Sequence, residues 1–68
     1  MEDSWTKKLE NGTVTYTTTG EVGAGFVHTV RFERGDVITT TSRQSTTQPT
    51  RQEVEELFED DVSKMLWK

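Results

Sequence analysis

Residues 4–20 of the chain read SWTKKLENGTVTYTTTG, and this stretch decides the fold. Two β-favouring, threonine-rich runs flank the dipeptide Asn11-Gly12, the strongest short-range signal for a two-residue type I′ turn. The segment therefore predicts a β-hairpin in which Leu9 lies opposite Val14. Because side chains alternate along a strand, this register places an apolar set on one side of the hairpin. The set consists of Trp5, Leu9, Val14 and Tyr16.

The alternation of apolar and polar side chains continues in residues 26–34, which predict a third strand. A turn at residues 34–36 then leads into a fourth strand that ends at Thr41. Because this turn can hold two residues or three, the pattern leaves open whether Val37 or Ile38 faces the core. The third strand directs four residues toward one side: Phe26, His28, Val30 and Phe32.

The period of the pattern changes after residues 42–49, a polar stretch that we expect to be an exposed linker. Thr50 and Glu53 match a capping box, in which both side chains satisfy free amides at a helix start. Apolar residues then recur at three- and four-residue spacings, so residues 50–67 predict one amphipathic helix. Its apolar stripe consists of Val54, Leu57, Phe58, Val62, Met65 and Leu66.

Together these segments predict a single α+β domain that spans residues 1–68. A four-stranded antiparallel sheet of two hairpins occupies residues 4–41, and the C-terminal helix packs on one of its faces. The other face is rich in threonine and stays open to solvent. A chain of this length buries only about 60% of its unfolded surface, so the core must be small.

The composition limits the chemistry of the chain. It has no cysteine, which excludes a disulfide framework and a thiolate metal site, and His28 is its one histidine. We expect His28 to be a structural residue of the core. No acid, base and nucleophile converge in the sequence, so we expect no enzyme, no cofactor and no metal. The start of the sequence lacks the basic and apolar runs of a signal peptide, which predicts a cytoplasmic protein.

Several charged or apolar residues are candidates for contact with a partner. Half of the twelve acidic residues lie in residues 51–68, and an acidic helix flank predicts a docking surface for a basic patch on another protein. Lys8 and Arg31 make the threonine-rich face a second contact surface. Trp67, near the end of the sequence, is typical of an interface centre. The predicted partner-binding residues are Glu55, Glu56, Glu59, Asp60, Lys8, Arg31 and Trp67.

A small acidic chain without catalytic residues fits a non-enzymatic protein-binding module. We expect it to act as a regulator or an inhibitor of a larger partner protein. Short acidic chains of this kind are frequent among phage-encoded inhibitors of host enzymes or defence systems. Association into a homodimer is a further expectation, since so small a domain gains burial from a second copy.

Binding of single-stranded nucleic acid is the alternative function. In architecture alone, four antiparallel strands followed by one helix is similar to the dimeric single-stranded-DNA-binding transcriptional coactivators, which clasp DNA with basic and aromatic residues of the sheet. The chain departs from that pattern in two ways. Its formal charge of −4 opposes attraction to phosphates. Its sheet aromatics are also predicted to face the core instead of offering stacking platforms.

Overall fold

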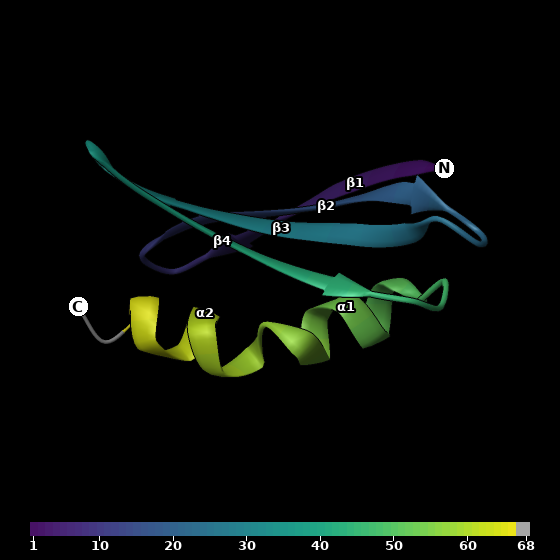
Figure 1. Cartoon of the computed structure of the whole chain (residues 1–68). Helices are drawn as coiled ribbons and strands as arrows, with labels where there is room; N and C mark the ends of the chain where they lie inside the picture. Colours follow the sequence, from purple (N-terminus) through teal and green to yellow (C-terminus); the bar gives the residue numbers. More distant parts are fainter. Residues whose placement is uncertain (67–68) are drawn as a thin grey trace.

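The computed structural model describes residues 1–66 and shows a four-stranded antiparallel sheet with two short helices along one face (Figure 1). The predicted α+β class and antiparallel sheet are confirmed. No helix among residues 1–66 is long and apolar enough to cross a membrane. In their order across the sheet, the strands are β1 (Glu2–Leu9), β2 (Gly12–Glu21), β3 (Gly25–Arg34) and β4 (Val37–Ser45). The helices are α1 (Arg51–Leu57) and α2 (Glu59–Leu66).

The first hairpin turns one position earlier than predicted. Leu9 pairs with Gly12, so the turn residues are Glu10 and Asn11, and neither has the positive φ that a type I′ turn requires. Gly12 is needed for a different reason, because a Cβ there would lie 2.2 Å from the carbonyl oxygen of Glu33 on β3. The pairing of β1 with β2 is therefore shifted by two residues from the predicted pairing. Since side chains alternate with a period of two, every side chain keeps its predicted face.

The second hairpin settles the register of β4. Arg34 pairs with Val37, so the turn holds two residues, Val37 lies on the helix side of the sheet and Ile38 lies on the open face. Both side chains remain exposed, at 59% and 54%. The polar segment expected to be a linker from residue 42 pairs with β3 as far as Ser45, which lies opposite Phe26. The strand is therefore longer and the connection to α1 shorter than predicted.

The start of α1 follows the predicted capping box. The Thr50 hydroxyl accepts a hydrogen bond from the Glu53 backbone N–H at 3.2 Å. The Glu53 carboxylate accepts the Thr50 backbone N–H at 3.1 Å in return. Two otherwise free amides are thereby satisfied at the first turn of α1.

The expectation of one continuous helix is wrong, because the helix breaks at Phe58. Phe58 has φ −104° and ψ 8°, outside the helical region, and α2 begins with a 2.8 Å hydrogen bond from the Val62 N–H to the Phe58 carbonyl. The first turn of α2 carries three acidic residues, which favour a helix N-terminus through the positive end of its dipole. These residues are Glu59, Asp60 and Asp61.

Phe58 and Val54 attach the helices to the sheet. Their side chains are 0% and 1% exposed. Leu57, which was predicted to belong to the apolar stripe, is 42% exposed and lies outside the core. The side chains of the sheet that complete the buried core are Val14, Tyr16, Val30 and Phe32. Partly buried residues that pack against the core are Trp5, Leu9 and Val62.

Three aromatic rings form a column through the two layers. The Trp5 ring stacks on the Tyr16 ring at 5.3 Å between centroids, and Tyr16 meets the Phe58 ring at 6.4 Å. An arginine covers each end of this aromatic column. The guanidinium of Arg51 lies 5.0 Å from the Trp5 ring, and that of Arg43 lies 5.9 Å from the Phe58 ring.

Both arginines are held in place by aspartates from the opposite layer. Arg51 on α1 donates two hydrogen bonds, of 2.9 and 2.8 Å, to Asp3 on β1. Arg43 on β4 donates bonds of 3.3 and 2.9 Å to one oxygen of Asp61 on α2. These exposed ion pairs add orientation more than stability, so the buried rings must supply most of the attachment.

His28 is a buried residue of the core face, as predicted, with 0% exposure. The Ser45 hydroxyl donates to the Thr47 carbonyl at 3.1 Å, so His28 Nε2, 2.7 Å from that hydroxyl, must be the donor between them. Nδ1 then accepts from the Thr18 hydroxyl at 3.0 Å. Burial lowers the pKa of His28, which keeps the ring neutral.

We expect Phe58→Ala to lower the free energy of unfolding by about 3–5 kcal/mol, since it empties the centre of the core. Leu57→Ala is the matched control in the same turn and should cost less than about 1 kcal/mol, because Leu57 is 42% exposed. Urea denaturation followed by circular dichroism measures both. Equal losses would contradict the assignment of Phe58 as the anchor.

We expect the protein to lose stability as the pH falls from about 7.5 to about 5.5. The unfolded chain takes up a proton near the ordinary histidine pKa of 6.5, whereas the folded chain resists it because burial lowers the pKa of His28. The unfolded state therefore binds more protons in this window. Urea denaturation at several pH values gives the free energy of unfolding as a function of pH. This free energy should fall with pH in the native protein and should fall less steeply in His28→Gln. The same pH dependence in both proteins would contradict the conclusion that His28 is buried and neutral in the folded state.

Candidate functional site: an acidic groove beside the helices

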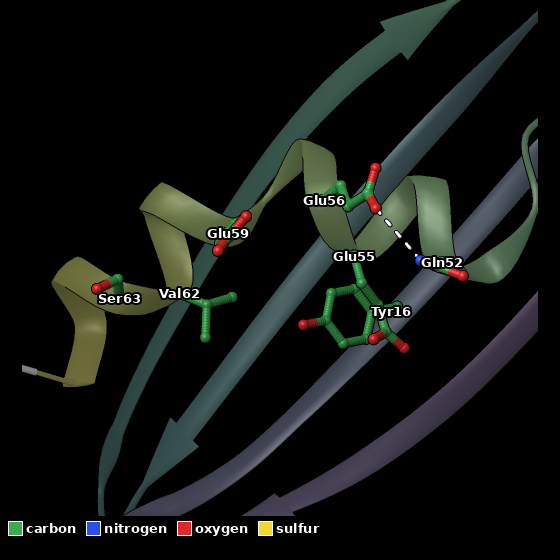
Figure 2. A pocket seen from close by; sticks show the side chains of 7 residues that line it. All are labelled: Tyr16, Gln52, Glu55, Glu56, Glu59, Val62 and Ser63. Atoms are coloured by element: carbon green, nitrogen blue, oxygen red, sulfur yellow. Dashed lines mark hydrogen bonds between the residues drawn. The ribbon is translucent and has the colours of Figure 1, made fainter.

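An open groove of about 550 Å³ lies where the two helices cross the sheet (Figure 2). Tyr16 reaches it from β2, and Figure 2 shows α1 and α2 supplying the remaining side chains on either side of the helix break at Phe58. We call this the acidic groove. Its lining consists of Tyr16, Gln52, Glu55, Glu56, Glu59, Val62 and Ser63.

Three of the predicted partner-binding residues meet in this groove. Glu55 and Glu56 come from α1, and Glu59 comes from the first turn of α2. Glu56 accepts a 3.4 Å hydrogen bond from Gln52 and is otherwise exposed. Within residues 1–66, no basic side chain pairs with Glu56 or Glu59. Both carboxylates are therefore available to a cation from outside the chain.

Glu55 has a structural role as well. Its carboxylate accepts the Trp5 indole N–H at 2.9 Å and also a hydrogen bond from the Lys7 ammonium, so it joins α1 to β1. The bond from Lys7, assisted by that from Trp5, lowers the pKa of Glu55. The hydrogen bond between Lys7 and Glu55 also raises the pKa of Lys7. Glu55 is thus held in one position on the sheet side of the groove, and its charge is paired with that of Lys7.

Tyr16 supplies a polar group that the described part of the chain leaves without a hydrogen bond. Its side chain is 5% exposed, and its hydroxyl has no hydrogen-bond partner among residues 1–66. Figure 2 shows this hydroxyl pointing along the groove toward Val62. Burial, and after it the charge of Glu55, raises the pKa of Tyr16, so the phenol stays protonated at neutral pH. It can therefore donate or accept a hydrogen bond inside the groove.

The other predicted site residues lie elsewhere. Asp60 is exposed and does not line the groove. Lys8 pairs with Thr13 and Arg31 pairs with Thr15, which places both basic residues on the open face, away from the helices. The partner-binding prediction thus divides between two faces of the sheet. Trp67 lies outside the described residues.

The open face of the sheet, on the side away from the helices, is rich in hydroxyl groups. One row across the sheet consists of hydroxyl residues alone, with Ser4–Thr17 and Thr29–Ser42 oxygens 3.4 Å apart. Arg31 on this face pairs with Glu33 at 3.1 Å. The face carries no aromatic residue of the strands, because those residues all point to the helix side. They are Trp5, Tyr16, Phe26 and Phe32.

The lining of the groove is chemically suited to a bound cation. The carboxylates of Glu56 and Glu59 can accept charge-assisted hydrogen bonds from an ammonium or a guanidinium group, whereas both oxygens of Glu55 already accept bonds from Trp5 and Lys7. The Tyr16 ring and Val62 can cover the aliphatic part of the same side chain. Residues 1–66 contain no cluster of three or more histidine, cysteine, aspartate or glutamate side chains placed to hold a metal ion.

Sequence patterns predicted the carboxylates of the groove but did not predict that Tyr16 and Val62 would line it. The charge run on the helix indicated Glu55, Glu56 and Glu59. Tyr16 was recognised as a core residue, but no sequence signal shows that its hydroxyl emerges beside the helices. Val62 belonged to the predicted apolar stripe, and its place at the groove depends on the break at Phe58.

No protein-family model matches the chain, and no curated protein or solved structure matches it. A function must therefore be inferred from the chemistry of the groove itself.

Proposed function

We propose that the protein is a non-enzymatic binding module that docks a basic segment of a larger protein in the acidic groove and so regulates or inhibits it. The observation that carries this proposal is that one groove is lined by three carboxylates and by Tyr16, whose hydroxyl has no hydrogen-bond partner among the described residues. Such a site is complementary to an arginine or lysine side chain. The absence of cysteine fits a reducing compartment, so the cytoplasm is part of the proposal.

The charges of the groove favour a partner that approaches from outside the chain. Glu55 is fixed by Trp5 and Lys7, so one carboxylate is already oriented before any partner arrives. Glu56 and Glu59 are exposed and add two carboxylates to the lining of the same groove. The formal charge of −4 adds long-range attraction that speeds encounter with a basic surface.

A module of this kind acts by covering a surface of its partner. The groove is open, so it accepts a side chain or a short segment presented by a folded protein, and the partner need not unfold to enter it. Inhibition follows if the covered surface contains basic residues that the partner uses. Single-stranded nucleic acid on the open face is less favoured, because that face has no aromatic platform and Arg31 is paired with Glu33.

We expect the double substitution Glu56→Lys and Glu59→Lys to abolish partner binding without unfolding the protein. Both side chains are exposed, whereas Glu55 is left intact because it ties α1 to β1. The matched control is Glu2→Lys with Glu21→Lys, which changes the net charge equally at exposed positions outside the groove. Tagged proteins are used for affinity capture from lysate of the source organism or its host, with and without nuclease treatment.

The native protein and the control should retain the same stoichiometric protein, identified by mass spectrometry, and the groove variant should lose it. Calorimetry with the purified partner should show a dissociation constant raised by about a hundredfold or more. Thermal unfolding by circular dichroism checks that all three proteins are folded. Equal capture by the two variants would contradict the proposal, as would capture that disappears on nuclease treatment.

A further inference from the structure

β4 is a sheet edge that lacks the usual protection against pairing. Of its nine residues, Arg43 alone is charged, and Asp61 of the same chain pairs with that charge at 2.9 Å. The strand contains no proline and no lysine, both of which discourage edge-to-edge contact. The opposite edge, β1, carries the adjacent lysines Lys7 and Lys8.

The surroundings of the β4 edge leave room for another strand. Val37 and Ile38, at the start of the strand, are 59% and 54% exposed and lie on opposite faces of the sheet. In Figure 2, α2 crosses β4 and its last turn extends past the strand. The ion pair from Arg43 to Asp61 confirms that α2 and β4 are neighbours. A further strand beside β4 would thus lie beneath the end of α2.

We propose that β4 pairs antiparallel with β4 of a second copy of this chain, so that two copies share one continuous eight-stranded sheet. Full overlap of the nine residues puts Thr41 opposite Thr41 of the second copy. Arg43 then lies opposite Thr39, so no like charges face each other in this register. The two-fold axis stands perpendicular to the sheet, which keeps the helices of both copies on the same face.

This arrangement is a closed dimer that cannot add further copies through β4. The same edge is used by both copies, so the dimer has no second β4 edge left to extend it. Pairing of β4 with β1 would instead be head-to-tail and would add copies without end. The proposal goes beyond partner binding in the acidic groove and does not depend on it.

The test is the molar mass of the intact protein in solution from about 1 μM to about 1 mM, measured by sedimentation equilibrium. The edge variant is Thr40→Glu with Ser42→Glu, because full overlap sets residue 40 of one copy opposite residue 42 of the other. The control is Ser4→Glu with Thr6→Glu, which occupies the same two rows of the open face on the β1 edge. All four positions are exposed.

The native protein and the control should form dimers, and the edge variant should dissociate on the order of tenfold more readily or stay monomeric, since introduced carboxylates would face each other. Circular dichroism verifies that both variants are folded. A native protein that remains a monomer at the highest concentration would overturn the proposal. Equal dimerisation of the two variants, or a mass that grows beyond the dimer, would overturn it as well.

Discussion

The contact between the rings of Phe58 and Tyr16 joins the two layers of the protein, and the other features depend on it. Phe58 is fully buried, interrupts the helix and sets where α2 begins. Tyr16 carries Trp5 on its other side, which extends the contact to β1. In a chain of 68 residues the core is too small to spare such a contact. The groove exists because the helices are anchored along this line, leaving one edge of Tyr16 uncovered.

The acidic residues of the helices divide into those that hold the fold and those that face outward. Glu53 closes the capping box, Glu55 binds Trp5 and Lys7, and Asp61 pairs with Arg43. Glu56 and Glu59 make no ion pair within residues 1–66. A run of acids that looks uniform in sequence therefore divides into a first set that bonds within the fold and a second set, Glu56 and Glu59, that we propose for partner binding. The distinction matters because only the second set can change a partner's affinity without changing the stability of the fold.

Alternation and helical spacing predict the layers and the faces of this protein well, because both patterns are set by which side chains must be buried. Positions along the chain are less predictable. Asn11-Gly12 signals a type I′ turn, yet Gly12 serves a close approach to Glu33, which only the third strand creates. β4 runs to Ser45 because β3 pairs with it there, although its own residues are polar. The charge run predicted the groove carboxylates, whereas the Tyr16 hydroxyl needed the packed helices to be seen.

Nuclear magnetic resonance can show whether the acidic groove recognises a cationic side chain. N-acetyl-arginine amide is titrated into the ¹⁵N-labelled protein, with the uncharged N-acetyl-citrulline amide as a matched control. We expect arginine, and not citrulline, to shift resonances of the groove alone, at Gln52, Glu56, Glu59 and Ser63. Shifts on the open face around Arg31, equal shifts with both compounds, or no shifts at all would contradict it.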